Sequence, residues 1–279
     1  MSKESIVNRL IYIGLQARQR GSQQVRKAVE QFIPRRRRQD AFQEQYLIKK
    51  TDFEIRLANL TRRLDTVEML VTRMYSQRGY KTESATESTA PASYLNRVTL
   101  EACRQDETVG TITVALDGPG GLNAEDLYRE EIRPYRDGGG RLCEFTRLAL
   151  DVEKCGKDAL GSLFHLAVIF AYNIHGATDL FIEVNPRHAA FYRRKLGFKI
   201  VGHEKVCRRV DAPAVLLHQK LSYISEQIIR FGGLKLKQNK SFYSYFMPPW
   251  EEREMTEQIR AMLERTEYAA QGNPDSAVA

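Results

Sequence analysis

The sequence predicts a mixed α/β fold, with one central sheet, helices on both of its faces and a helical extension at each end. Apolar residues make up 42% of the 279 residues, which is enough for a sizeable buried core. Between residues 51 and 221, segments with the alternating pattern of strands are interspersed with segments of helical spacing. The apolar run 180–184 indicates a buried strand, and a proline and a basic helix follow it. We therefore expect an α/β core over residues 51–221.

The first half of this core is expected to contain three strands and one helix. Residues 53–57 alternate between apolar and polar side chains, as a strand does. A helix is expected at 60–79, because apolar residues recur at helical spacing and a glycine closes the segment. Residues 82–93, rich in Thr, Ser, Ala and Glu, indicate a flexible loop. A hairpin is expected next, with strands at 98–102 and 108–116.

The second half continues the alternation of helices and strands. The expected order is a short helix at 124–135, a strand at 142–151, an apolar helix ending at 172, a strand at 180–184, a basic helix from 188, and strands at 200–209 and 214–221. Residues 222–279 predict a C-terminal extension with a helical region, a break at 247–250, a last charged helix and a disordered tail.

Residues 1–50 predict a basic helical extension. They contain twelve Lys/Arg and four Asp/Glu, and 12 − 4 = +8 equals the formal charge of the whole chain. A charge excess confined to one end favours an interaction element over a general nucleic-acid surface, so no nucleic-acid partner is expected. Two interpretations stay open. The extension is either a solvated arm packed on the core, or an element that docks on an acidic carrier protein or an anionic membrane surface.

Several features that define other classes of protein are missing from the sequence. No apolar run approaches the roughly 18 residues that span a bilayer, and the basic, polar N-terminus has no signal-peptide core. Cys103, Cys143, Cys155 and Cys207 are scattered without CxxC spacing, and the histidines have no ligand-like spacing. We therefore expect no metal and a reducing, cytoplasmic setting, with peripheral attachment to the inner membrane as a variant.

Two motifs carry the chemical information. Glu144-Phe-Thr-Arg147 places two opposite charges in an otherwise apolar strand. Residues 185–192, Asn-Pro-Arg-His-Ala-Ala-Phe-Tyr, open the basic helix that follows the buried strand, and Gly-Phe at 197–198 closes it. Strands and a helix arranged in this way can hold an acyl thioester and an amine side by side, so acyl transfer is the leading hypothesis.

The element order and the two motifs resemble the GNAT acyltransferases. Within that superfamily they are similar to the FeeM-type N-acyl amino acid synthases, which are related to the acyl-homoserine lactone synthases. The resemblance covers about residues 52–221, and it includes Phe-Glu-Ile-Arg at 53–56 and Arg-Gly-Tyr at 78–80. It implies a GNAT-like sheet and an acyltransferase activity.

Glu144 and Arg147 are the predicted catalytic residues. Amide formation from a thioester needs a neutral amine, and an α-ammonium is mostly protonated at pH 7, so a base must lie within hydrogen-bond reach. We predict Glu144 as this base and Arg147 as the partner of an amino-acid carboxylate. Regular strand geometry points them to opposite faces, but the GNAT resemblance implies a bulge that turns both toward the cleft. The alternative is an ion pair between the strand and its neighbours.

Further residues are expected to bind the two substrates. Tyr192 lies five residues before Gly197, one more than the usual spacing of a GNAT proton donor, so packing of the helix is an equal interpretation of this tyrosine. The expected substrate-binding residues are Arg187, His188, Tyr192, Leu148 and Leu150, and the expected contacts of the acyl-donor arm are Gly156, Lys157 and Gly161.

The acyl donor is expected to be acyl carrier protein, with acyl-CoA as the alternative. GNAT enzymes that bind CoA hold its pyrophosphate on a glycine-rich turn at a helix N-terminus. Here that turn starts with Glu153 and carries Asp158 where a small residue is expected, and negative side chains disfavour a pyrophosphate. The phosphopantetheine arm of a carrier protein ends in a single phosphodiester. We therefore expect an acyl-phosphopantetheine donor and no tightly bound cofactor.

The sequence thus predicts an N-acyltransferase that moves a long-chain acyl group from acyl carrier protein to the α-amine of an amino acid. One alternative is an enzyme like the acyl-homoserine lactone synthases, which would use S-adenosylmethionine. The other is a degenerate GNAT domain that serves as an interaction or membrane-surface module. The basic extension, in place of an aromatic N-terminal pattern, weighs against the first alternative, and the retained Glu144 and Arg147 weigh against the second.

Overall fold

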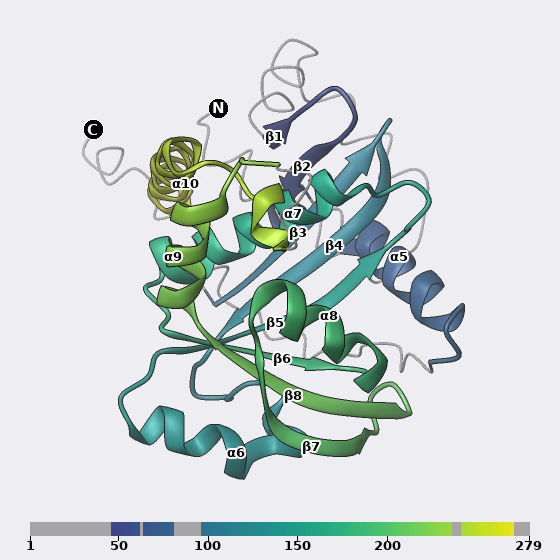
Figure 1. Ribbon diagram of the computed structural model, residues 1–279. Helices are drawn as coiled ribbons and strands as arrows, with labels where there is room; N and C mark the ends of the chain where they lie inside the picture. Colours follow the sequence, from purple (N-terminus) through teal and green to yellow (C-terminus); the bar gives the residue numbers. More distant parts are fainter. Residues whose placement is uncertain (1–45, 62–63, 81–95, 236–240, 271–279) are drawn as a thin grey trace, which may run out of the picture. The chain divides into compact units, whose positions relative to one another are not determined.

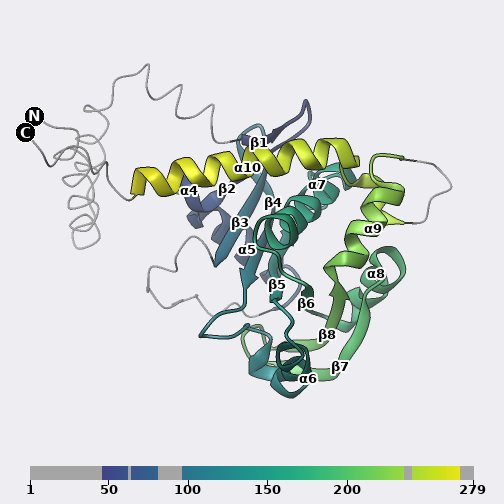
Figure 2. The same cartoon turned by 90° about the vertical axis from the view of Figure 1, so that its left-hand side faces the viewer.

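The computed structural model describes residues 46–61, 64–80, 96–235 and 241–270 (Figures 1 and 2). These residues belong to one unit that begins at Tyr46. The predicted helices of the basic extension, the loop at 82–93 and the C-terminal tail lie outside the described residues. Those predictions therefore stay predictions.

In the described part of the chain, eight strands form one mixed sheet in the order β1-β2-β3-β4-β5-β6-β8-β7 (Figure 1). Neighbouring strands are antiparallel except β5 and β6, which run parallel. The strands are β1 (Tyr46–Lys49), β2 (Glu54–Leu57), β3 (Arg97–Arg104), β4 (Glu107–Leu116), β5 (Leu142–Leu150), β6 (Asp179–Val184), β7 (Lys199–Cys207) and β8 (Ala212–Lys220). The predicted α/β fold with a mixed central sheet is confirmed.

Helices cover both faces of the sheet. Helices α5 and α6 pack on the face that carries Ala149 and Leu142, whereas α7, α8 and α9 pack on the face that carries Cys143 and Leu180. The helices are α4 (Ala58–Thr61), α5 (Leu64–Ser76), α6 (Glu125–Asp137), α7 (Lys157–Val168), α8 (Pro186–Leu196), α9 (Leu221–Phe231) and α10 (Pro249–Ala270), with a π-helical turn at Ile169–Ile174 and a 3₁₀ turn at Phe242–Tyr245.

Helix α8, which the second motif predicted, is fixed at both ends by its local sequence. Asn185 caps the N-terminus by accepting a hydrogen bond from the backbone N–H of Arg187 (3.2 Å). Pro186 stands in the first turn, where its fixed φ suits a helix. Gly197 ends the helix with φ 79°, a left-handed conformation that glycine adopts readily. These caps position Arg187 and His188 at the start of the helix.

Strand β1 lies in the segment that the charge pattern assigned to the basic extension. It pairs with β2, with Ile48 opposite Ile55, and Ile48 is buried. The sheet therefore begins at Tyr46, upstream of the expected start of the core. The sequence concealed this strand because Lys49 and Lys50 follow the apolar residues, and four residues at a sheet edge show little periodicity.

The C-terminal region packs on the same core as the sheet. Ile224 and Ile228 of α9, and Met255 and Ile259 of α10, are buried in the main hydrophobic cluster. The predicted break near residue 248 separates the 3₁₀ turn from α10. Figures 1 and 2 show that α10 crosses the direction of α7, and Asn173 of the π-helical turn donates to Glu252 of α10 at 2.9 Å. Helices α9 and α10 are therefore part of the core and not an appendage.

A buried ion pair joins β2, β3 and β4 to helix α5. The Nε atom of Arg56 on β2 donates to Oε2 of Glu101 on β3 at 3.1 Å, and these side chains are 1% and 0% exposed. The Glu101 carboxylate also accepts hydrogen bonds from Thr108 on β4 and, at 3.2 Å, from Thr66 on α5. Removal of one partner of such a pair leaves an uncompensated charge in the core.

Arg56→Met is expected to lower the free energy of unfolding by about 3–5 kcal/mol, because Glu101 then stays buried without its cation. Urea denaturation of the purified protein measures the change. Lys49→Met is the control: Lys49 also pairs with a glutamate, Glu54 at 3.3 Å, but its side chain is 70% exposed, so a loss of at most about 1 kcal/mol is expected. Equal losses in the two variants would contradict the role of burial.

Candidate active site

Strands β5 and β6 separate in the middle of the sheet. Three register pairs join them, and the last is Glu144 opposite Phe181. Within the described chain, no pair links the two strands beyond that point, although β5 runs on to Leu150 and β6 to Val184. The backbone edge of β5 that faces β6 therefore lacks a ladder there, and it can bind an extended group that enters the opening. We call this opening the split.

Strand β5 is bulged at Arg147. Thr146 lies opposite Thr113 of β4, but Ala149 lies opposite Thr111, so β5 contains one residue more than β4 over this stretch. Arg147 adopts φ 53°, in the left-handed region. An extra residue in one strand of an antiparallel pair is the definition of a β-bulge.

The bulge changes the direction of the side chains beyond it. In a regular strand, side chains three residues apart point to opposite faces of the sheet. Here Glu144 contacts the start of α6 and Arg147 contacts α5, and these two helices lie on the same face. The bulge that the family resemblance implied is therefore confirmed. It brings the two charged residues of the first motif to one face.

Glu144 is buried beside the split, with 2% of its surface exposed. Its carboxylate oxygens accept hydrogen bonds from the backbone N–H groups of Asn123 (2.9 Å) and Ala124 (3.0 Å), just before α6. Burial raises the pKa of Glu144, and the two backbone hydrogen bonds oppose this rise. Because each carboxylate oxygen has two acceptor positions, each can still accept a further bond. Glu144 thus combines a fixed position with raised basicity.

Arg147 has a different partner. It forms an ion pair with Glu68 of α5, which ties β5 to a neighbouring helix as the alternative for this motif expected. Glu144 and Arg147 bind separate groups and are not an ion pair with each other. Tyr75, at the end of α5, is close to the same guanidinium. Burial raises the pKa of Tyr75, and the charges of Arg147 and Arg78 act in the opposite direction.

A second cationic group stands at the start of α8. The Nη2 atom of Arg187 donates to the hydroxyl of Tyr80 at 2.7 Å, and the guanidinium lies 5.3 Å from the centre of the Tyr80 ring. The Nε atom of Arg187 donates to Nε2 of His188 at 3.2 Å. Burial lowers the pKa of His188, and the charges of Arg187 and Arg78 lower it further. The imidazole is therefore neutral at pH 7.

These groups form one cationic and aromatic surface beside the split. The rings of Tyr75 and Tyr80 pack edge to face, with centres 5.8 Å apart, and so connect Arg147 to Arg187. We define the arginine–tyrosine cluster as Tyr75, Arg78, Tyr80, Arg147 and Arg187. The motifs predicted the two outer arginines as site residues. The other three come from the end of α5, where the only signal was the Arg-Gly-Tyr of the family resemblance.

Tyr192 of α8 belongs to the main hydrophobic core. It is 7% exposed and packs edge-on against Phe164 and Phe198, on the α7 side. Burial raises its pKa, and the neighbouring Tyr75 raises it further, although α5 lies on the opposite face. Its hydroxyl has no hydrogen-bond partner in the described chain. These contacts agree with the interpretation of Tyr192 as a residue that packs α8 against the core.

Thr146 belongs to the first motif, but no role was predicted for it. It stands beside the bulge, and its Oγ1 is buried without a hydrogen-bond partner in the described part of the protein. A buried hydroxyl is normally satisfied, so this atom is a candidate contact for a substrate in the split. Threonine is common in strands, so its place in the motif did not by itself indicate a contact for its hydroxyl.

The N-terminus of α7 faces open space at Gly156. This residue is the N-cap, and no heavy atom lies within 4 Å of the place where a Cβ would stand. No side chain caps the helix, so its first N–H groups can meet an anion. Lys157 follows, with Nζ 5.9 Å from the ring centre of Tyr245. Asp158 forms an ion pair with Lys235, which offsets the negative charge that was expected to disfavour CoA.

The other predicted contacts divide into two groups. A Cβ at Gly161 would lie 2.6 Å from the carbonyl oxygen of Tyr245, so the absent side chain makes room for the C-terminal region. The structure thus gives Gly161 a packing role, and its contact with the donor arm stays a prediction. Leu148 and Leu150 are half-buried and pack against the main core.

Metal and membrane features were also sought in the structure. Among the described residues, no group of three or more His, Cys, Asp or Glu side chains could hold a metal ion. In the same ranges, no helix is both long enough and apolar enough to cross a membrane. The four cysteines are free thiols, and Cys155 is the least buried of them.

A mixed sheet that splits between two parallel strands, with a bulged strand on one side and an open helix N-terminus nearby, defines a GNAT-type acyltransferase. The family profile of the N-acyl amino acid synthase FeeM matches residues 66–220 of the chain. The chain therefore belongs to the FeeM family of N-acyl amino acid synthases, and it is an N-acyltransferase.

One solved structure carries the comparison further. The chain is similar to FeeM, an N-acyl amino acid synthase from uncultured soil microbes, with 27% identity and a TM-score of 0.55 over 62% of this chain and 98% of that one. More distant matches include a GNAT family acetyltransferase from Streptococcus pneumoniae (16% identity, TM-score 0.40, 60% and 98% covered) and the AHL synthase LasI (14%, 0.41, 61% and 89%). No curated protein matches the chain by sequence.

At position 147, glycine is expected to be more stable than alanine by about 1 kcal/mol, because the left-handed conformation costs an L-residue roughly 1–2 kcal/mol. Urea denaturation of Arg147→Gly and Arg147→Ala measures the difference, and both variants lack the ion pair with Glu68. Val206 on β7, 62% exposed, is the control. There the alanine variant is expected to be the more stable by about 0.5–1 kcal/mol. The same order at both positions would contradict the bulge.

Proposed function

We propose that this N-acyltransferase moves a long-chain acyl group from the phosphopantetheine arm of acyl carrier protein to the α-amine of an amino acid. The observation that carries the proposal is the arginine–tyrosine cluster. Its three guanidinium groups, on Arg78, Arg147 and Arg187, lie beside the split, and a guanidinium fork suits a carboxylate. An acceptor with a carboxylate gains from this cluster, whereas a simple amine does not. The name of the family, N-acyl amino acid synthase, supports the same acceptor class.

The split accommodates the thioester in this proposal. The carbonyl lies along the β5 edge beyond Glu144, where backbone N–H groups stabilise charge on its oxygen. The amine approaches from the face of Glu144 and Arg147. One proton of the ammonium passes through a water molecule to Glu144 and then to solvent. The amine nitrogen attacks the carbonyl carbon, the C–N bond forms and the C–S bond breaks. A second proton from nitrogen protonates the leaving thiolate.

The surface around the split favours a carrier protein as donor. The open N-terminus of α7, with Gly156 and Lys157, suits the single phosphodiester of a phosphopantetheine arm. The last turn of α8 exposes Arg193, Arg194 and Lys195, which form a basic surface for an acidic carrier. A donor of this kind also places the reaction in the cytoplasm.

The donor and the acceptor are tested together. The full chain is incubated with a labelled acyl group on carrier protein or on CoA and with a pool of amino acids, and mass spectrometry identifies the products. We expect an N-acyl amino acid, formed faster from the carrier protein and lost when an amino amide replaces the amino acid. Absence of amide product from both donors contradicts the proposal. A lactone formed only with S-adenosylmethionine would identify an acyl-homoserine lactone synthase instead.

Glu144→Gln is expected to lower kcat by about 10²–10⁴-fold, the usual contribution of a positioned base. The loss of stability is smaller, about 1–3 kcal/mol, because one of the two backbone N–H groups loses its acceptor. Glu130→Gln on α6 is the matched control: Glu130 is 68% exposed and pairs with Arg133, so its kcat is expected to equal that of the wild type. A folded Glu144→Gln enzyme with wild-type kcat would show that Glu144 serves to hold α6 in place.

A further inference from the structure

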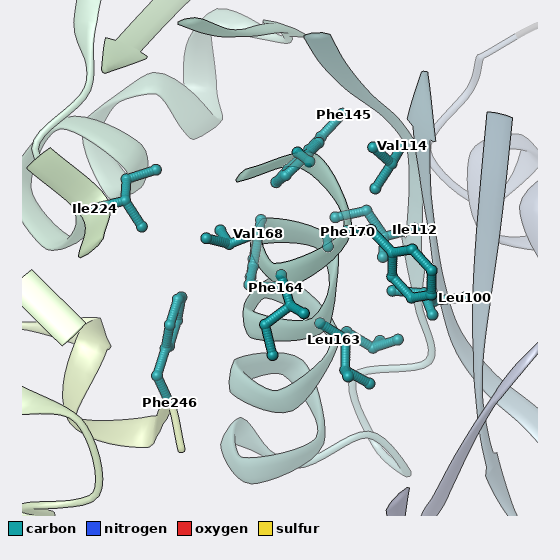
Figure 3. Close-up of a cluster of buried hydrophobic side chains, with 14 of the residues drawn as sticks. Leu100, Ile112, Val114, Phe145, Leu163, Phe164, Val168, Phe170, Ile224 and Phe246 are labelled. Carbon is teal, nitrogen blue, oxygen red and sulfur yellow. The ribbon is translucent and has the colours of Figure 1, made fainter. Parts of the chain in front are cut away.

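The apolar side of the split leads to a small internal cavity. Two of its lining residues, Phe145 and Leu180, stand next to the last register pair of β5 and β6. Figure 3 shows Val168 and Phe164 of α7 on the side of Ile224 and Phe246, while Leu163 of the same helix lies toward Leu100. The lining residues used below are Phe145, Leu180, Phe164 and Val168, and on the far side Tyr243 and Phe246.

The cavity is apolar and nearly filled. Its volume of about 10 Å³ is barely the space of one water molecule. The hydroxyl of Tyr243 donates to the carbonyl oxygen of Leu196 at 2.8 Å and presents no unsatisfied polar group. A cavity of this kind suits hydrocarbon, because a polar group inside it would lose its hydrogen bonds to water. Because the volume is so small, entry of a hydrocarbon chain requires the surrounding aromatic side chains to move.

The far wall of the cavity belongs to a segment outside the family match. We define residues 242–247 as the cap segment. The match with the FeeM family ends at residue 220, before α9 and the cap segment. The similarity to the solved FeeM structure uses 62% of this chain and 98% of that one. The cap segment is therefore an addition to the part of the fold that the family shares.

Backbone contacts hold the cap segment in place. The N–H of Met247 donates to Nδ1 of His165, which is fully buried, at 2.9 Å. The N–H of Gly233 donates to the carbonyl oxygen of Phe246 at 2.8 Å. Gly161 lets the backbone of Tyr245 approach α7 closely. Since these contacts are made by the main chain, the position of the segment is fixed while its side chains decide the depth of the cavity.

We infer that the acyl tail of the donor runs from the split into this cavity and that the cap segment ends its path, with Phe246 and Tyr243 setting the longest chain the enzyme accepts. The inference rests on the proposed function. The thioester carbonyl lies on β5 beyond Glu144, and Phe145 is the next residue on the opposite face, so a tail that leaves the carbonyl on that side meets the cavity directly. The wall at its end is fixed, which gives the tail a maximum length.

The test compares chain-length profiles. The kcat/KM of the full chain is measured with a series of straight-chain acyl carrier proteins, from octanoyl to octadecanoyl, and with one amino acid. In Phe246→Leu the optimum is expected to move to longer chains, with about a fourfold gain in kcat/KM for each additional methylene that fits. Val168→Leu, which enlarges a side chain of the opposite wall, is expected to move the optimum to shorter chains.

Phe242→Leu is the matched control. Phe242 belongs to the cap segment and is as buried as Phe246, at 6% against 3% exposed, but it does not line the cavity. Its ring packs on Phe191, with centres 5.4 Å apart, and reaches Phe164 and Phe246 only edge-on, at 6.4 Å. A comparable loss of stability is expected, with a clearly smaller shift of the profile than in Phe246→Leu.

The outcomes separate the inference from the proposed function. An unchanged profile in folded Phe246→Leu, or an equal shift in Phe242→Leu, overturns the inference while the proposed function stands. If Phe246→Leu does not fold, Val168→Leu decides, and an unchanged profile there overturns the inference. A wild-type enzyme that forms no amide from any donor in the series overturns the proposed function, and the inference with it.

Discussion

The left-handed conformation of Arg147 is the constraint on which the rest of the site depends. The extra residue in β5 sends Glu144 and Arg147 to one face, and a bulged strand also bends. Without the extra residue in β5, the side chain of Arg147 would point into the apolar core beneath α7. The same irregularity thus accounts for the direction of the charged side chains and for the departure of β5 from β6, which opens the sheet between two parallel strands.

The pleat of β5 separates two kinds of chemistry. Glu144 and Phe145 are neighbours in sequence, and a strand sends neighbours to opposite faces. Glu144 accordingly lies on the face of α5 and α6, bound to backbone N–H groups, while Phe145 lies with α7 in the aromatic core. Under the proposed function, the polar acceptor and the apolar tail of the donor bind on opposite faces of the sheet. The amine and the thioester carbonyl come together at the split between β5 and β6.

The sequence was informative wherever the signal was local. The alternation of strands and helices predicted the fold, and the caps of α8 were visible as Asn185, Pro186 and Gly197. Contacts between distant segments were not visible. Gly161 was predicted to contact the donor arm, because the neighbouring sequence does not indicate that the backbone of Tyr245 packs against this glycine. The proximity of Tyr75 to Arg147 could not be predicted for a similar reason. The helix that carries Tyr75 is predictable, but its contact with Arg147 depends on a bulge in a distant strand.

The cap segment has a consequence for how such enzymes diverge. The residues proposed for bond formation lie within the stretch shared with the FeeM family, and the wall proposed to limit the acyl tail lies after it. Selection on product length can therefore act on six residues near the C-terminus while the reaction centre drifts little. Relatives that share β5 and α8 but differ at residues 242–247 would then release N-acyl products of different chain length from the same chemistry.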